Sequence, residues 1–480
     1  MQYYSLAKQS PNVNFKTAAI TGQAPDKGLY FPTTIPQFTK EQIEKFKTLD
    51  KASLAFEVMK PYVGGTIDDA SLQQICAETI NFDFPLVPIT DTIYALELFH
   101  GPTLAFKDVG ARFMSRCLGY FSKQIKAEKF AQSTKVEPEQ IVETKDNIKN
   151  AISASKPTTV LVATSGDTGG AVANGFLGVE GVNVIILYPK GKVSPIQELQ
   201  LTTCGQNITA LEVEGSFDDC QAIVKDAFMD ASLNAAYNLT SANSINVARW
   251  LPQQLYYFFA WQQWVAKYGD QIPMHIVVPS GNFGNICAGM MAKASGLPLG
   301  HFVAACNANN VVTRYLQTGN YEIHKAVATV SNAMDVGNPS NFVRIMEIMQ
   351  NNFENLKQGL SSYSYDDVVT ASTIHRVYKT NDYILDPHGA VAFLAAEQFI
   401  QEKLQTSSLQ NVESETSNLR AIILETAHPV KFPEVVEAAI GQTIDIPVSV
   451  QFLLYKEKVA IPMGASFSEF KAWMLANARS

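Results

Sequence analysis

The chain contains short apolar runs, rich in β-branched residues, that each end in a turn of Gly, Ser or Asn residues. The clearest runs are 158-TTVLVATSGDTG-169, 182-VNVIILYPKG-191, 275-HIVVPSGNFGN-285 and 421-AIILETAHP-429. Most of them are followed by a segment long enough for a helix. This alternation predicts parallel sheets covered by helices, with ligand sites at the carboxyl ends of the strands. The pattern is therefore that of an α/β enzyme.

Two polar segments interrupt the pattern, and the length of the chain indicates more than one domain. Residues 122–150 are rich in charged side chains, and residues 402–419 are rich in Ser and Thr. Both compositions are typical of surface insertions or linkers. A chain of 480 residues with 46% hydrophobic content can bury more than one core, so we expect two or three domains.

Charge and cysteine content argue against several classes of function. The formal net charge is -8, and no Lys/Arg-rich run would attract nucleic acid. The six cysteines lack CxxC spacing, so we expect neither a metal site nor a disulfide framework. The first residues lack a signal-peptide pattern, and no run approaches about 18 to 20 apolar residues. We therefore expect a cytoplasmic protein without a membrane segment.

Two Gly-rich loops at predicted strand ends are candidate anion sites. In 280-SGNFGN-285 the glycines let backbone amides approach a phosphate, and the following helix adds its positive dipole end. An ordinary strand–helix turn has the same residues. In 164-TSGDTGG-170, Ser165, Thr168 and nearby amides suit a carboxylate, although Ser165 or Asp167 would also serve as a helix cap. The motifs GxGxxG, GxxxxGKS/T, HExxH and GxSxG are absent, which leaves the usual nucleotide, metalloprotease and serine-hydrolase hypotheses without support.

One lysine stands in an unusually apolar stretch, 98-LFHGPTLAFKDVGARFM-114. Burial disfavours the charged form of an amine, which lowers its pKa and makes it a usable nucleophile toward a carbonyl compound. Phe106 and the residues before it would supply such surroundings for Lys107. The alternatives are a lysine that extends to solvent from a helix start, or one that pairs with Asp108.

Seven blocks of sequence, taken in order, resemble the threonine synthase family over nearly the whole chain. They are HGPTLAFKD, ATSGDTGGAV, NSINVARWLPQ, VPSGNFGN, SNAMDVGNPSN, DPHGAVA and ETAHPVKF, and the opening APDKGLYFP resembles that family too. The resemblance implies the tryptophan-synthase-β-like fold, fold type II of pyridoxal-phosphate enzymes, with helix-flanked parallel sheets in a large and a small domain. It also implies an N-terminal threonine-synthase domain at residues 1–95, a lysine-bearing segment and small domain at 96–215, and a large domain at 216–480. We expect the chain to cross between these domains.

The resemblance implies that Lys107 carries pyridoxal 5'-phosphate. In that case the cofactor phosphate would be bound by Gly281, Asn282, Phe283, Gly284 and Asn285. Thr426 would face the pyridine nitrogen, unless it only caps its strand end.

Substrate contacts are implied for two further segments. Ser165, Gly166, Asp167 and Thr168 match the loop that receives the amino acid carboxylate; relatives such as the cysteine synthases usually carry TSGNTG, from which Asp167 departs. We expect Asn243, Ser244 and Asn246 near Arg249 over about two helical turns. Arg249 is the candidate for the substrate phosphate, with a structural ion pair as its alternative.

Other polar residues remain open. Lys190 and Lys192 would add positive charge at the opening of the substrate site, or they would simply be exposed on a solvated turn. Asn332, Asp335, His388 and His428 match family blocks without an assigned role.

The implied reaction converts O-phospho-L-homoserine and water to L-threonine and phosphate, by γ-elimination and β-replacement. This is the last step of threonine biosynthesis, and the enzyme would be a carbon–oxygen lyase that acts on phosphates, as a monomer or homodimer. Alternatives are a threonine or serine dehydratase of the same fold, an inert relative that binds phosphorylated ligands, and a nucleotide-binding oxidoreductase. We expect a smaller domain with TSGDTGG to close on a larger one with SGNFGN.

Overall fold

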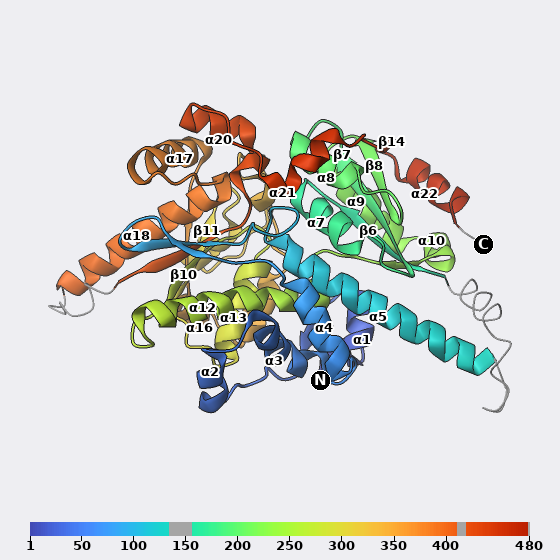
Figure 1. The fold of residues 1–480 in the computed structure, drawn as a ribbon, viewed down its shortest axis with the longest axis horizontal. Helices are drawn as coiled ribbons and strands as arrows, with labels where there is room; N and C mark the ends of the chain where they lie inside the picture. The colour runs from blue at the N-terminus through green and yellow to red at the C-terminus, as the bar shows by residue number, and fades with distance from the viewer. Residues whose placement is uncertain (134–155, 410–418, 479–480) are drawn as a thin grey trace.

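The computed structural model describes residues 1–133, 156–409 and 419–478, which form three sheets and the helices that cover them (Figure 1). The first 79 residues build a small antiparallel sheet and the helices packed beside it. Its elements are β1 (Gln2–Ser5), β2 (Val13–Asn14), α1 (Phe15–Thr21), β3 (Tyr30–Pro32), α2 (Lys40–Phe46), α3 (Lys51–Val63) and α4 (Asp69–Thr79). Each helix begins after an Asn, Thr or Asp whose side chain accepts a hydrogen bond from the first turn, which explains where it starts.

The larger sheet has six strands in the order β12-β11-β10-β13-β5-β4, and all neighbours are parallel except β4 and β5. The strands are β4 (Leu86–Pro88), β5 (Ile93–Glu97), β10 (His275–Pro279), β11 (Phe302–Cys306), β12 (Leu360–Ser364) and β13 (Ala421–Glu425). Val277 and Ile423 pack on one face, and Ile276 and Ile422 belong to the core on the other. A parallel sheet buried on both faces needs such continuous apolar strands, so the runs predicted at 275–285 and 421–429 are confirmed.

Helices cover both faces of this sheet. They are α12 (Gln254–Tyr268), α13 (Gly284–Ala294), α14 (Val311–Thr318), α15 (Phe342–Ile348), α16 (Phe353–Gly359), α17 (Asp367–Asn381), α18 (Pro387–Leu409) and α20 (Pro433–Ile440). Helices α17, α18 and α20 share one core with the sheet, and α12 and α13 belong to the other core (Figure 1).

The smaller sheet has five parallel strands in the order β14-β8-β7-β6-β9. The strands are β6 (Thr158–Ala163), β7 (Val182–Pro189), β8 (Ile208–Glu214), β9 (Asn238–Thr240) and β14 (Ile461–Gly464). Its helices are α5 (Lys107–Ser133), α7 (Asp167–Phe176), α8 (Pro195–Thr202), α9 (Phe217–Met229), α10 (Ala231–Ala236) and α22 (Phe467–Ala476). The strands predicted at 158–169 and 182–191 are confirmed here.

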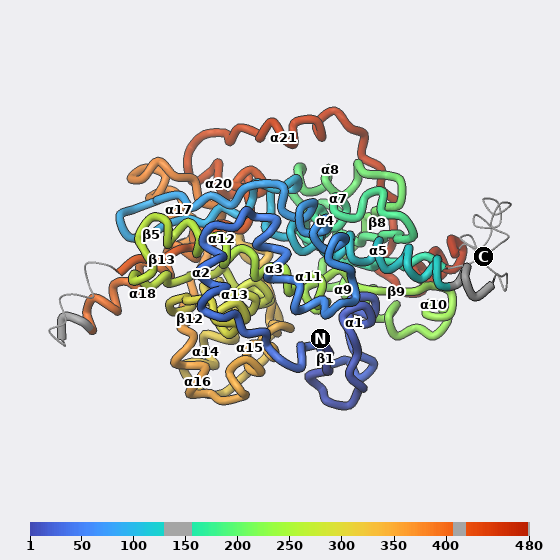
Figure 2. Tube along the Cα trace, turned by 60° about the horizontal axis from the view of Figure 1, so that its bottom comes forward, coloured from blue at the N-terminus to red at the C-terminus, as the bar shows by residue number. Residues whose placement is uncertain are grey.

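The sheets do not follow the segment limits expected from the sequence. Strands β4 and most of β5 lie before residue 96 but belong to the larger sheet, whereas β9 and β14 lie beyond residue 215 and belong to the smaller one. Figure 2 shows the chain passing from α20 through α21 (Val448–Gln451) toward the smaller sheet. The chain thus crosses between the sheets repeatedly. The limits at 95 and 215 do not coincide with those of the sheets, and as domain boundaries they stay a prediction.

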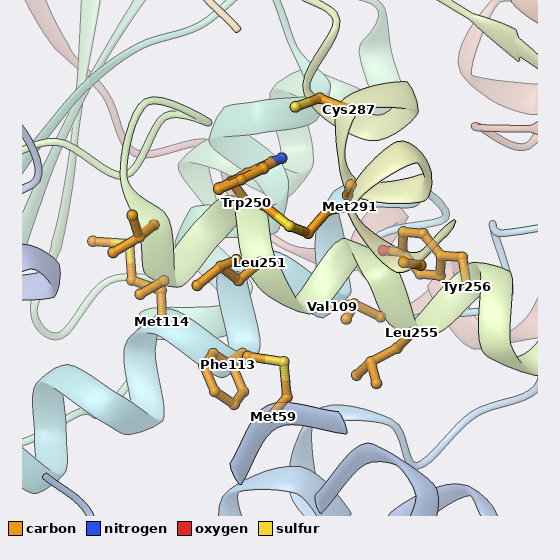
Figure 3. Close-up of a cluster of buried hydrophobic side chains, with 14 of the residues drawn as sticks. Met59, Val109, Phe113, Met114, Trp250, Leu251, Leu255, Tyr256, Cys287 and Met291 are labelled. Carbon is orange, nitrogen blue, oxygen red and sulfur yellow. The ribbon is translucent and has the colours of Figure 1, made fainter. Parts of the chain in front are cut away.

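The two sheets meet at a buried core built around the start of α5. Figure 3 shows Val109 and Phe113 of α5 beside Met59, Trp250 and Met291. Trp250 ends the short helix α11 (Val247–Trp250), which continues through η1 (Leu251–Gln253) into α12. The first turn of α5 is therefore held rigidly between the sheets.

The two polar segments differ from the linkers expected from composition. Residues 122–133 continue helix α5, and residues 402–409 complete α18, so these parts are not linkers; residues 122–128 and 402–406 are half-buried or exposed, as expected of a surface segment. The remainder of both segments, apart from residue 419, lies outside the described residues. Within the described ranges, no helix has both the length and the apolar character needed to cross a membrane.

Candidate active site

A cleft with a volume of about 200 Å³ lies at the carboxyl ends of β6, β10 and β13. Most of the predicted site residues line it: Lys107, Ser165, Thr168, Asn243, Ser244, Arg249, Gly281, Asn282, Phe283, Gly284, Asn285, Asn332, Asp335, His388 and Thr426. Gly166, Asp167, Asn246, Lys190, Lys192 and His428 do not line it. The cleft is where the strand-end rule for parallel sheets places a ligand.

Lys107 is the first residue of α5 and lies beside the end of β13. The Phe106 N–H donates to the carbonyl oxygen of Thr426 at 2.9 Å, which joins the two segments. The Lys107 side chain is only 16% exposed, so it does not extend to solvent. Asp108 does not pair with it, because the Asp108 carboxylate accepts from the Thr103 N–H and hydroxyl at 2.9 and 2.5 Å. Burial lowers the pKa of Lys107, and the nearby charges of Lys431 and Arg249 act in the same direction against that of Asp167.

The loop 280–285 ends β10 and starts α13 at Gly284. Phe283 takes the left-handed conformation with φ 58°. A Cβ on Gly281 would lie 2.5 Å from the Cα of Met334, so only glycine permits this close approach. The Asn282 Oδ1 accepts from the Ser340 N–H at 2.6 Å and is thereby committed to structure. The structure thus contains both the predicted turn and the N-terminus of α13 that follows it. Since the Asn282 oxygen is already hydrogen-bonded, the backbone amides of the loop are the groups able to bind a phosphate.

The segment 243–249 is not two turns of helix, and this prediction is wrong. Helix α11 begins only at Val247 because Asn246 caps it, accepting from the Ala248 N–H at 2.9 Å. Asn246 is fully buried and donates to the Ala19 carbonyl at 2.8 Å instead of facing the cleft. The Ser244 hydroxyl accepts a hydrogen bond from Asn341 Nδ2 at 2.9 Å, which joins this segment to the start of α15.

Arg249 reaches the cleft beside Lys107. It is 4% exposed, and its Nη1 donates to the Lys107 carbonyl at 3.3 Å. Over the described residues it forms no ion pair, so the structural alternative is not observed. Burial lowers its pKa to about 10. An uncompensated buried guanidinium favours an anionic ligand.

Three buried polar atoms of the cleft-lining residues have no hydrogen-bond partner among the described residues: Arg249 Nε, Gln253 Oε1 and Asn285 Nδ2. Gln253 Nε2 donates to the Arg249 carbonyl at 3.0 Å, which leaves its Oε1 as an acceptor. Tyr257 Oη donates to Asn285 Oδ1 at 2.8 Å, which leaves its Nδ2 as a donor. Buried groups of this kind are costly unless a ligand satisfies them.

In the loop 164–170, Ser165 and Thr168 face the cleft and Asp167 faces elsewhere. Helix α7 is capped by neither Ser165 nor Asp167: Gly166 stands at the N-cap position with φ 137°. Thr164 Oγ1 accepts from the backbone of Gly166 and Gly169 at 3.0 and 2.8 Å. The expected capping alternative is therefore wrong, and Thr164 is the residue that the sequence pattern missed.

The carboxylate of Asp167 pairs with two lysines. Lys431 Nζ lies 2.6 Å from Asp167 Oδ1, and Lys107 Nζ lies 3.8 Å from Oδ2. Gln197 Nε2 donates to the same Oδ1 at 3.0 Å. Lys431 was not singled out from the sequence, where it is simply a lysine in a turn after a Pro.

His388 lines the cleft and is hydrogen-bonded to the segment 332–334. Its Nδ1 is 2.6 Å from Asp386 Oδ2, and its Nε2 accepts from the Ala333 N–H at 3.2 Å. Asp335 accepts from the Thr329 N–H at 2.9 Å. These hydrogen bonds fix the conformation of the segment 332–335, whose Met334 packs against Gly281.

The other candidates are structural. Lys190 is exposed and pairs with Glu214, and Lys192 is exposed on the same turn, as the solvated-turn alternative expected. His428 Nδ1 accepts from the Val430 N–H at 3.2 Å, and burial lowers its pKa to about 4. No group of three or more His, Cys, Asp or Glu side chains in the described chain could hold a metal ion.

Family comparisons agree with this architecture. Residues 2–80 match the family model "Threonine synthase N terminus", residues 85–410 match "Pyridoxal-phosphate dependent enzyme" and residues 390–473 match "Threonine synthase, C-terminal". The chain is 36% identical over 475 residues to threonine synthase from Serratia marcescens, covering 99% of each chain. It is 38% identical over 475 residues to that from Haemophilus influenzae, covering 99% of this chain and 100% of the relative.

Solved structures show the same likeness. Threonine synthase from Escherichia coli superposes with a TM-score of 0.83 at 36% identity, covering 99% of this chain and 100% of that one. The PLP-bound threonine synthase from Brucella melitensis superposes with a TM-score of 0.84 at 32% identity, covering 100% of both. The fold is thus that of a fold type II pyridoxal-phosphate enzyme, and the chain belongs to the threonine synthase family.

Proposed function

We propose that the protein is a threonine synthase, which converts O-phospho-L-homoserine and water to L-threonine and inorganic phosphate. The observation that carries this proposal is that the buried amine of Lys107 and the unpartnered guanidinium nitrogen of Arg249 line one cleft. The amine suits covalent chemistry, and the guanidinium suits a phosphate group. Likeness to threonine synthases over nearly their whole length supports the same substrate.

The residues of the cleft fit pyridoxal 5'-phosphate. Lys107 would carry it, the backbone amides of 281–285 would bind its phosphate, and Thr426 would face its ring nitrogen. The unpartnered Asn285 Nδ2 and the close approach at Gly281 support a ligand at this loop. When bound, the cofactor supplies an electron sink that stabilises negative charge on the substrate carbons.

The protein's own groups would bind, orient and move protons. The Lys107 amine, kept in its neutral form more readily by burial, would take the proton from Cα, remove one from Cβ and later deliver one to Cγ. Ser165 and Thr168 would bind the substrate carboxylate, with the amide of Gly166. Arg249 would bind the phosphate as it leaves Cγ before water adds at Cβ.

Asp167 does not fit the carboxylate role that the family resemblance implied for it. Its own carboxylate is 5% exposed and is paired with Lys431. A carboxylate also has no hydrogen to donate to another carboxylate. We therefore restrict the substrate contacts of this loop to Ser165, Gly166 and Thr168.

Closure of the smaller sheet on the larger would exclude water from the cleft. Small-angle scattering and amide exchange with and without substrate test this, and identical profiles would contradict it. We also propose that the enzyme works in the cytoplasm, as a monomer or homodimer; light scattering of the purified protein measures the second point.

The decisive experiment measures phosphate and threonine together from O-phospho-L-homoserine, beside a Lys107→Ala variant. Equal amounts of both products, lost in the variant, are expected. Phosphate without threonine would indicate a lyase that ends in a keto acid, such as a dehydratase. Absence of both products in protein that holds the cofactor would favour an inert relative that binds phosphorylated ligands.

A further inference from the structure

A fully buried charge cluster links the two sheets directly behind Lys107. Lys431, just after β13 of the larger sheet, is 0% exposed and lies 2.6 Å from Asp167, which opens α7 beside the smaller sheet. Lys431 Nζ also donates to the Thr103 carbonyl at 2.8 Å. Gln197 of α8 donates to Asp167. Each polar atom of this cluster is held from a different element, so its geometry is fixed.

The cluster is asymmetric toward Lys107. One oxygen of Asp167 is bound by Lys431 and Gln197, while the other faces the Lys107 amine at 3.8 Å. Removing two charges from water to form a buried ion pair is costly, and the loss of either partner afterwards is costly too. Packing alone would be served as well by apolar side chains of similar volume.

We propose that Asp167 and Lys431 form a positioning pair: the Asp167 carboxylate lies between the two lysines, and the charges of the pair together set the protonation of the Lys107 amine. The inference rests on the proposed role of Lys107 as the amine that carries the cofactor. It assigns Asp167 and Lys431 no contact with substrate. Both act through Lys107.

Every charged group that faces Lys107 enters this balance. Asp167 favours the ammonium form, and Lys431 and Arg249 oppose it. Asp108, the next residue, is buried and held by Thr103. Asp167 raises the pKa of Lys107 more strongly than Lys431 lowers it, although burial keeps the pKa lowered overall. Removing one member of the pair therefore moves the titration of Lys107 in a direction set by the charge removed.

The test measures covalent capture of pyridoxal 5'-phosphate by the full chain as a function of pH. Protein stripped of cofactor is mixed with pyridoxal 5'-phosphate, and borohydride-fixed adduct on Lys107 is quantified by mass spectrometry over time. Only the neutral amine attacks, so the rate reports its fraction, and one unit of pKa changes the rate about tenfold below the midpoint. Lys431→Met should shift the midpoint upward and slow capture at pH 7 about tenfold.

Asp167→Asn should shift the midpoint downward and speed capture over the same range. Lys431→Arg keeps the charge and should stay within about twofold of the wild type. Lys190→Met removes an exposed lysine that follows β7 of the smaller sheet and is the control for loss of charge. It should leave the profile unchanged.

Either single variant leaves one buried charge unpaired and could therefore fail to fold. The double variant Asp167→Asn/Lys431→Gln removes both charges and is measured for this reason. Its midpoint should lie below that of the wild type and above that of Asp167→Asn, because Asp167 has the stronger effect on Lys107. A common midpoint for all variants that fold would overturn the proposal. If the wild type forms no adduct at any pH, the proposed function of Lys107 fails instead.

Discussion

The carboxyl group of Glu425 should make the stability of the protein depend on pH. Glu425 ends β13 and is 0% exposed, directly before Thr426. A Cβ on Gly389 would lie 1.7 Å from Glu425 Oε1, so the carboxyl is packed tightly on the first turn of α18. Burial raises its pKa well above the usual value of 4.5, and the nearby carboxyls of Asp386 and Glu97 raise it further.

The sign follows from proton binding. Above pH 4.5 the folded state binds this proton more tightly than the unfolded state, so the contribution of Glu425 to stability decreases as pH rises toward the folded-state pKa. The expected slope is about 1.4 kcal/mol in the free energy of unfolding for each pH unit within that window. Glu425→Gln keeps the shape without the titration. It should gain stability relative to the wild type as pH rises.

Urea unfolding of both proteins at several pH values from about 4 to about 8 measures the difference. Glu434→Gln, which removes an exposed carboxyl from α20, is the control for loss of charge. A constant difference between wild type and Glu425→Gln across this range would show that Glu425 is not protonated in the folded state. The reasoning from burial and the neighbouring carboxyls would then be wrong.

Three further predictions concern the cleft and the larger sheet. Gly281→Ala should weaken binding of pyridoxal 5'-phosphate at least about tenfold in an absorbance titration, with circular dichroism unchanged, because the new Cβ would lie 2.5 Å from the Cα of Met334. Tyr257→Phe should cost about 1 kcal/mol in urea unfolding and weaken inorganic phosphate binding, because Asn285 loses the hydrogen bond that orients its amide. Burial lowers the pKa of His301 to about 4, so the contribution of His301 to the unfolding free energy should fall as pH drops from about 6.5 to 4; in urea unfolding, His301→Gln should therefore gain stability relative to the wild type over that range.

Periodicity predicted the strands of the sheets well because burial on both faces demands continuous apolar residues. The runs at 158–169 and 275–285 became β6 and β10, and their loops face one cleft. Composition failed at 122–133, where the charged residues continue α5. A solvated helix and a linker need the same polar side chains, so composition does not distinguish them. The order of strands within each sheet could not be predicted either, because strands such as β6 and β9 pair although they are far apart in the sequence.

The start of α11 shows how a single side chain changes a predicted site. A helical pattern over 243–249 places Asn246 near Arg249 on one face. Asn is also a strong helix cap, and the structure uses it so, with its amide bonded to Ala248 and Ala19. Asn246 is thus turned away from the cleft, while Arg249 enters it from inside the short helix.

The pairing of Asp167 with Lys431 lies furthest from what a sequence reveals. A charged residue in a Gly-rich loop looks like a ligand contact, and a lysine after a Pro turn looks solvated. Only the meeting of the two sheets brings the carboxylate within 2.6 Å of that lysine and 3.8 Å of Lys107. Once buried together, the charges are no longer screened by solvent, so each affects the titration of the others. An acidic residue at position 167 is therefore tolerated beside an anion-binding loop because Lys431 neutralises it, and the same carboxylate then remains within reach of the amine.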